Sequence, residues 1–311
     1  MKSRALCSFV CIWLWYDSVA QHPAVLDSVT QNPNYVTLSE VILRSGVSVP
    51  VFLDKVRNDT SFYKAFKNLR ILQFQSENDI RFFDKKGSIL AASHSQTRQI
   101  RKGACRFSER IDERVLGDYY QSDSSLTYYT AELFTSLFFA KTPVCGESTI
   151  IGNRTVTTSG KQGIEKHKDM LKMLLFNPGK RIPGIPFMGS KTAMLDEDKL
   201  GHYDMELRED TLDGKPYLLF QQTVKPGHQD AVVVDRMKTW FTFDSYQIVN
   251  REYSLSYRAG VYDFDVTMRV KLMPWKSLWV PETIYYLGNW KVAFKKRERA
   301  AFFIRFAAFS E

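Results

Sequence analysis

Residues 262–272 decide the fold, and they read Tyr-Asp-Phe-Asp-Val-Thr-Met-Arg-Val-Lys-Leu. Large apolar or aromatic side chains alternate with charged or polar ones along the whole stretch. Successive side chains of a β-strand point to opposite faces of a sheet, so the stretch predicts a strand with one buried and one wet face.

Four neighbouring segments have the same composition and predict further strands: 233–243, 248–257, 278–286 and 300–308. The predicted connections are Asp244-Ser245, Ala259-Gly260, Pro274 to Ser277 and Gly288-Asn289. Connections this short join antiparallel neighbours. The sequence therefore predicts an antiparallel meander over residues 203–309.

The chain before the meander predicts helices and a hairpin. Residues 21–70 form an N-terminal helical segment in this interpretation, with Ser48 and Thr60 as candidate N-caps. Short alternating runs on either side of Lys86-Gly87 predict the hairpin. Residues 126–139 and 164–176 return to helical spacing. We expect residues 71–311 to form one α+β domain, in which a curved antiparallel sheet, an open half-barrel, packs on helices.

The segment from Pro178 to Met194 is rich in proline and glycine and still apolar. Loops of this length are usually polar and lie on the surface, so its apolar side chains need cover. It either fills the core or forms a lid over a pocket, and Ile185, Phe187 and Met188 are the candidate lid residues.

The composition of the 311 residues, with 44% hydrophobic and 25% charged content, excludes a disordered chain, a collagen-like repeat and a polytopic membrane protein. Two values stand out, the 14% aromatic content and the formal net charge of +9.

The amino terminus has the pattern of a signal peptide. Lys2 and Arg4 precede an apolar run from Ala5 to Trp15, and Ser18-Val19-Ala20 supplies small residues for a signal peptidase. We expect residues 1–20 to be removed by cleavage after Ala20 and the protein to be periplasmic. The alternative is a buried N-terminal helix.

Export leaves two cysteines, Cys105 and Cys145. In an oxidising compartment they form either one disulfide or two buried thiols. The sequence lacks a Gly-x-Ser-x-Gly elbow, a His-Glu-x-x-His motif and a Cys-x-x-Cys motif, so we expect no enzyme, no metal and no cofactor. The acidic segment 196–213 is interpreted as a solvated turn region, with a divalent-ion site at Asp196 to Asp198 as the alternative.

Basic and aromatic residues are interleaved near the end of the chain. Export removes nucleic acid as a partner, so the basic side chains either face water on a strand pair or contact an anionic envelope surface. The residues concerned are Lys295, Lys296, Arg297 and Arg299.

Two resemblances follow from these segments. Residues 240–246, 262–266 and 280–284 resemble the outer-membrane lipoprotein-sorting carriers, whose unclosed curved sheet wraps helices and shelters acyl chains. Residues 58–70, 176–179 and 295–299 resemble a family of exported proteins of Gram-negative bacteria without an assigned function. The resemblance implies a binding or carrier protein for a hydrophobic ligand, either a lipid or a lipidated protein.

An aromatic concave face would bind such a ligand without any reactive group. The candidate lining residues are Trp240, Tyr253, Tyr257, Phe264, Met268 and Tyr285. The alternatives are a structural envelope protein whose sheet interior is filled by its own side chains, and a hydrolase in which His202 works with nearby acids.

Overall fold

The computed structural model describes residues 41–42, 49–147, 172–182, 188–259, 262–292 and 296–311. The predicted signal peptide, Ser48, Ile185, Phe187 and Lys295 lie outside these residues.

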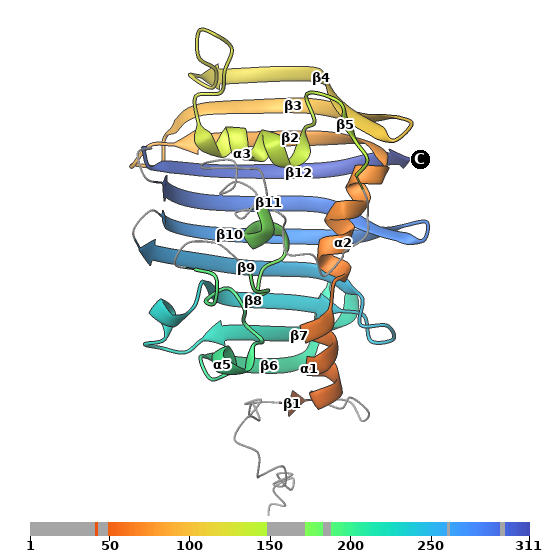
Figure 1. Ribbon diagram of the computed structural model, residues 1–311, viewed down its shortest axis with the longest axis vertical. Coiled ribbons are helices and arrows are strands. Elements are labelled where there is room, and N and C mark those ends of the chain that lie inside the picture. Colours follow the sequence, from red (N-terminus) through yellow and green to blue (C-terminus); the bar gives the residue numbers. More distant parts are fainter. Residues whose placement is uncertain (1–40, 43–48, 148–171, 183–187, 260–261, 293–295) are drawn as a thin grey trace, which may run out of the picture. The chain divides into compact units, whose positions relative to one another are not determined.

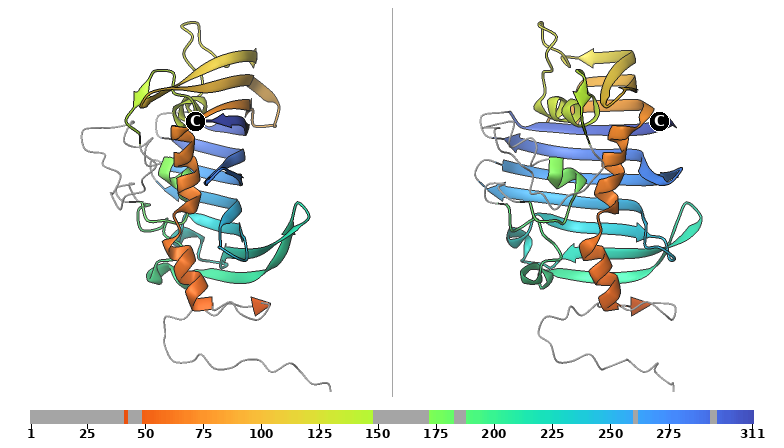
Figure 2. Two further views of the ribbon diagram at one scale, coloured as in Figure 1. Left: turned by 90° about the vertical axis from the view of Figure 1, so that its right-hand side faces the viewer. Right: turned by 45° about the vertical axis from the view of Figure 1, so that its right-hand side comes forward.

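One sheet of 12 strands dominates the described residues (Figure 1). Its strands in chain order are β1 (Val41–Ile42), β2 (Gln73–Phe83), β3 (Ile89–Lys102), β4 (Cys105–Gly117), β5 (Val144–Cys145), β6 (Tyr203–Leu212), β7 (Lys215–Val224), β8 (Val234–Phe241), β9 (Ile248–Ala259), β10 (Tyr262–Trp275), β11 (Leu278–Val292) and β12 (Glu298–Ser310). Their order in the sheet is β1-β6-β7-β8-β9-β10-β11-β12-β2-β3-β4-β5. All pairs are antiparallel except β1 with β6. The two edge strands do not pair with each other, so the sheet is unclosed, and Figure 2 shows its curvature.

The helices lie on one face of this sheet, which we call the covered face; the opposite face is the outer face (Figure 2). They are α1 (Val49–Asn58), α2 (Ser61–Asn68), α3 (Tyr129–Phe138) and the short α5 (Glu197–Leu200), with helical residues also at 172–176. Apolar side chains at three- and four-residue spacing anchor α1 and α2. Phe52 of α1 packs edge-on against Phe220 and Phe241, and Phe62 of α2 contacts Tyr253. The predicted fold class, an open curved sheet packed on helices, is confirmed.

The alternation in residues 262–272 gives β10 its two faces. Phe264, Val266, Met268, Val270 and Leu272 are all buried in one apolar core. The polar residues between them point to the outer face, where Arg269, for example, pairs with Glu252 at 2.7 Å. This strand lies between β9 and β11, as its position in the meander predicts.

The predicted turn at Gly288-Asn289 is wrong, because both residues lie inside β11. Gly288 instead makes room for an aromatic side chain two residues away on the same face: a Cβ at Gly288 would lie 1.9 Å from the hydroxyl oxygen of Tyr286. The predicted turn at 274–277 is also too long, since β10 continues to Trp275.

The sequence predicts a solvated turn region over the acidic segment 196–213, and this prediction is wrong for most of the segment. It contains α5 and the whole of β6. Two carboxylates of β6 are paired on the outer face: Glu206 and Asp210 form ion pairs with Arg208 at 2.8 and 3.2 Å.

The described residues, which include α1, α2 and the sheet, belong to one compact unit. Within the described part of the chain, no helix is long and apolar enough to cross a membrane.

Candidate functional site

Four of the six predicted lining residues share the covered face. Tyr253, Tyr257, Phe264 and Met268 are buried in the main core. They contact the chain's own residues: the Tyr253 hydroxyl donates to the carbonyl oxygen of Leu175, and the Tyr257 and Phe264 rings are 6.2 Å apart. This part of the covered face is therefore packed with protein side chains.

Trp240 and Tyr285 lie on the outer face, so they cannot line a cavity with the other four. Trp240 packs with Leu219 and Val249 in a separate cluster, and its indole N–H donates to Asp210 at 2.8 Å. Tyr285 is 40% exposed, next to the buried Tyr286. Trp240 lies in β8, whose pairing with β9 contains register shifts. Because of these shifts, a simple period of two does not predict which face of the sheet each β8 side chain occupies.

The described parts of the segment 178–194 belong to the core. Ile182, Met188 and Met194 are buried there, and the Met194 amide donates to the carbonyl oxygen of Gly179 at 3.0 Å. Of the three candidate lid residues, only Met188 lies among the described residues, and it is fully buried.

The covered face changes character at β3. Its inward-facing residues from 93 to 99 are Ser93, Ser95, Thr97 and Gln99, all of which are buried. Buried hydroxyl and amide groups need hydrogen-bond partners, because a polar group buried without one costs free energy. Here Ser93 donates to Glu113, and the Gln99 amide donates to the carbonyl oxygens of Leu69 and Leu72. The sequence shows no apolar alternation over these residues, so the alternation does not predict this site. The available signal was the alternation of short hydroxyl side chains with longer polar ones.

A pocket of about 320 Å³ lies over these hydroxyl groups, and we call it the β3–β4 pocket. Strands β2 to β4, α3 and a loop around Tyr119 to Leu126 enclose it; the loop is held by a bridge between Tyr120 and Leu126. Its size falls within the range of ligand pockets in proteins, about 300–1,000 Å³. Its lining is Ile80, Ser93, Ser95, Thr97, Ser108, Glu109, Arg110, Glu113, Tyr119, Tyr120, Leu126, Thr135, Phe139 and Lys141.

Glu113 organises the polar wall of the pocket. Its side chain is 12% exposed and accepts hydrogen bonds from Ser93 at 2.7 Å, Tyr120 at 2.9 Å and Arg110 at 2.6 Å. Burial raises the pKa of Tyr120, and the hydrogen bond to Glu113 raises it further. Burial also raises the pKa of Tyr119. Both tyrosines therefore remain protonated at neutral pH and can donate hydrogen bonds.

A second layer of polar groups lies behind the pocket floor. The Ser76 and Thr97 hydroxyls are 2.7 Å apart, and the Asn78 amide nitrogen donates to the carbonyl oxygen of Ser95 at 3.2 Å. The Asn78 side-chain oxygen is buried without a hydrogen-bond partner among the described residues. These hydrogen bonds hold Ser95 and Thr97 in place behind the pocket.

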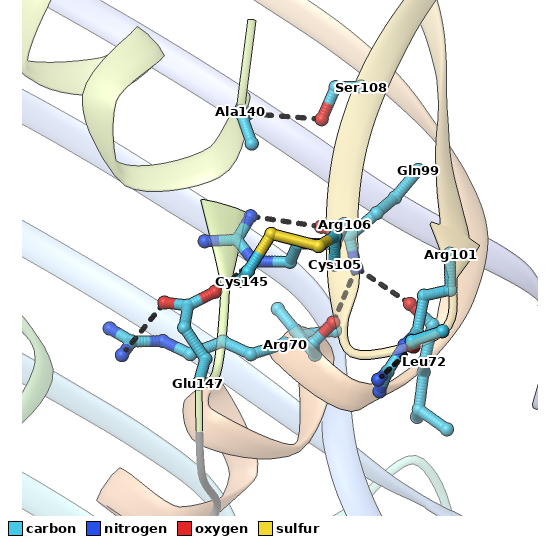
Figure 3. Close-up of polar contacts among 12 residues, drawn as sticks. Arg70, Leu72, Gln99, Arg101, Cys105, Arg106, Ser108, Ala140, Cys145 and Glu147 are labelled. Carbon is cyan, nitrogen blue, oxygen red and sulfur yellow. Dashed lines mark hydrogen bonds and ion pairs between the residues drawn. A yellow bond between two sulfur atoms is a disulfide. The ribbon is translucent and has the colours of Figure 1, made fainter. Parts of the chain in front are cut away.

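The far end of β3 and β4 is fastened by a disulfide between Cys105 and Cys145, which are register partners of β4 and β5 (Figure 3). The carboxylate of Glu147, two residues after Cys145, accepts a hydrogen bond from the Arg106 guanidinium and forms an ion pair with Arg70 at 3.2 Å. These contacts tie the start of β4 to the segment that follows α2.

Other features are less enclosed. A larger and more open hollow of about 520 Å³ lies on the outer face, and its carboxylates, Asp235 and Asp265, carry like charge. A gap of only about 30 Å³ lies among the aromatic rings near Phe138 and Phe176, which is room for about one water molecule.

The predicted basic surface is partly engaged within the molecule. Arg297 pairs with Asp263, and Arg299 donates to the carbonyl oxygen of Asp84 at 3.2 Å. Lys296 is exposed.

His202, the histidine proposed for a hydrolase, lines none of the three hollows described above. His202 contacts His228, with their Nδ1 atoms 2.7 Å apart, at the start of β6 and after β7. In the described part of the chain, no group of three histidine, cysteine or acidic residues is arranged to hold a metal ion.

No protein-family model matches the chain, and no curated protein matches it. Solved structures that are similar to it include the following three. A DUF1329 family protein from Desulfovibrio piger has 13% identity and a TM-score of 0.25, over 83% of this chain and 88% of that one. A putative outer membrane lipoprotein-sorting protein domain from Vibrio parahaemolyticus has 10% identity and a TM-score of 0.27, over 84% and 91%. A LolA superfamily protein from Nitrosomonas europaea has 11% identity and a TM-score of 0.23, over 85% and 94%. The fold assignment rests on this chain's own strand order.

Proposed function

We propose that the protein is a non-catalytic binding protein of the cell envelope, and that its ligand is an amphiphile such as a lipid or a lipidated protein. The observation that carries the proposal is the β3–β4 pocket. It combines an apolar wall of Ile80, Leu126 and Phe139 with hydroxyl groups and an internally paired acid. Binding sites for small molecules are typically apolar clefts with a few fixed polar groups that orient the ligand.

The pocket moves the binding site away from the aromatic centre proposed from the sequence. Tyr253 and its buried neighbours hold the helices to the sheet. The β3–β4 pocket lies beside α3, where a polar group and a short apolar segment fit together. A longer acyl chain needs apolar surface beyond the pocket, and Val115, two residues along β4 from Glu113, is an apolar residue that is 45% exposed.

The test is native mass spectrometry with lipid extraction, on protein purified from its own envelope fraction. We expect a bound amphiphile in the wild type and its loss in Ser95→Leu, because a larger side chain would occupy the pocket floor. Thr211→Leu, at an exposed position of β6, is the control and should keep the ligand. Equal ligand content in both variants, with both folded by circular dichroism, would contradict the proposed site, and recovery of no amphiphile from the wild type would contradict the function.

Export is part of the same proposal and has its own measurement. The intact mass of the native protein should correspond to a chain that begins at Gln21, because the small residues Ser18 and Ala20 precede that position. A native chain that retains residues 1–20 would contradict export by a cleaved signal.

A further inference from the structure

Resting on the proposed function, we propose that the polar group held in the β3–β4 pocket is an uncharged polyhydroxyl group, the chemistry of a saccharide head. The pocket's hydroxyl floor, its charge balance and its aromatic wall each support this assignment.

The floor offers both donors and acceptors. Ser93, Ser95 and Thr97 alternate along the covered face of β3. The Ser93 hydroxyl donates to Glu113 and the Thr97 hydroxyl bonds with Ser76, so both keep lone pairs that can accept a further hydrogen bond. The Ser95 hydroxyl accepts from the Asn78 amide at 3.5 Å and can donate its own proton. Ser108 and Thr135 add further hydroxyls from β4 and α3. A ligand group that also donates and accepts through the same atoms can satisfy such a floor, and hydroxyl groups do so.

The charges in the pocket favour a neutral occupant. Glu113 and Arg110 pair at 2.6 Å inside the pocket, and Glu109 and Lys141 supply one further charge of each sign. A phosphate would lie against the Glu113 carboxylate, and a quaternary ammonium would lie against the Arg110 guanidinium. Either ion would meet a like charge as well as an opposite one in the pocket, whereas a neutral polar group avoids these repulsions.

The aromatic wall suits the apolar side of a sugar ring. The Tyr119 and Tyr120 rings meet edge-on with centroids 5.0 Å apart, and Phe139 lines the pocket beside α3. The C–H groups of a sugar can pack against such rings while its hydroxyls reach Glu113 and the floor. With the tyrosine rings on one side and the Glu113 carboxylate on another, the pocket would hold the saccharide in one orientation.

Three amphiphiles with the same octyl chain separate the possible head groups: octyl glucoside, octyl phosphate and octyl trimethylammonium. Isothermal titration below their critical micelle concentrations should give at least tenfold tighter binding of the glucoside. Tighter binding of the phosphate or the ammonium compound that Ser95→Leu abolishes would overturn the saccharide assignment and leave the proposed function standing. Binding of none of the three would count against both.

Two conservative variants test recognition by hydroxyl groups. Ser95→Ala and Tyr120→Phe should each weaken octyl glucoside binding by about fivefold, the typical effect of one hydrogen bond, without changing octyl phosphate binding. Ser136→Ala on the exposed side of α3 and Tyr285→Phe on the outer face are the matched controls, since neither residue lines the pocket. Unchanged glucoside affinity in both pocket variants, with unaltered melting temperatures, would contradict a saccharide held by these hydroxyls.

Discussion

At the scale of single residues, Gly288 allows the Tyr286 side chain to lie where a Cβ atom at position 288 would otherwise be. The Tyr286 ring stacks on Phe302 with centroids 4.4 Å apart and an interplanar angle of 4°. Its hydroxyl reaches across Gly288 and accepts a hydrogen bond from the indole of Trp290. A Gly-Asn pair usually indicates a turn, but here the glycine serves a close approach within a strand.

We expect Gly288→Ala to lower the free energy of unfolding by about 1–3 kcal/mol, because the new methyl group overpacks the site. Urea denaturation measures the change. Gly201→Ala is the control, since nothing lies within 4 Å of a Cβ there and its backbone has an ordinary φ. Equal stability of the two variants would show that the Tyr286 ring can move at little cost.

Asp235 gives the protein a pH-dependent stability term. Burial raises the pKa of this carboxyl above its ordinary 3.8, the nearby Asp265 raises it further, and a hydrogen bond from Ser256 opposes the rise. A raised pKa means that the folded state holds the proton more tightly. Stability from this group is therefore greatest at low pH and is lost as the pH rises from 3.8 through the folded-state pKa.

Asp235→Asn should remove that loss, because asparagine does not titrate and can still accept the bond from Ser256. Its melting temperature, relative to the wild type, should rise between pH 3 and pH 7. Asp204→Asn, at an exposed position of β6, serves as the comparison. A constant difference between Asp235→Asn and the wild type across this range would mean that Asp235 is not the source.

At the scale of elements, α3 depends on a residue far away in the chain. Its N-cap residue, Tyr128, supplies no side-chain cap. Instead the Glu298 carboxylate, at the start of β12, accepts hydrogen bonds from the backbone amides of Tyr129 at 2.7 Å and Thr130 at 2.8 Å. A negative charge at a helix N-terminus is favourable, so this contact both caps the helix and fixes it to the sheet.

Glu298→Gln should reduce the free energy of unfolding by about 1–2 kcal/mol, because the amide caps the helix without the charge. Hydrogen exchange should also accelerate selectively in α3, which contributes Thr135 to the pocket lining. Glu197→Gln, at an exposed acid of α5, is the control. Uniform acceleration across the sheet would indicate a general destabilisation and not a lost cap.

The Cys105–Cys145 bridge acts on the element that carries Glu113. It closes a loop with a sequence separation of 40 residues, which contains most of β4 and all of α3. Replacing both cysteines by alanine should therefore lower the free energy of unfolding by about 4 kcal/mol in the chain-entropy description. Guanidinium titration with and without reductant measures it: the reductant should destabilise the wild type and leave the double variant unchanged. A reductant effect of the same size on both would contradict the assignment to this bridge.

At the scale of the whole molecule, the sequence predicts the sheet more completely than the site. Strands with apolar alternation, such as β10, could be found because burial of one face leaves a period of two in the sequence. Strand β4 could not, since Glu109 to Arg114 are polar or exposed and leave no such period. The faces of Trp240 and Phe241 could not be assigned because a register shift separates these adjacent apolar residues. The pocket was missed for a related reason: its floor uses Ser95 and Thr97, which alternate with other polar residues.

The position of β12 has a consequence for how the chain can assemble during synthesis. β12 pairs on one side with β11 and on the other with β2, so it joins the β2–β5 and β6–β11 parts of the sheet. Until residues 298–310 have left the ribosome, these two parts have no strand between them, and α3 lacks the Glu298 cap. A chain interrupted shortly before β12 would retain most of its strands but expose two long unpaired edges, which are templates for aggregation. Premature termination late in the message should thus be more harmful than the small number of missing residues suggests.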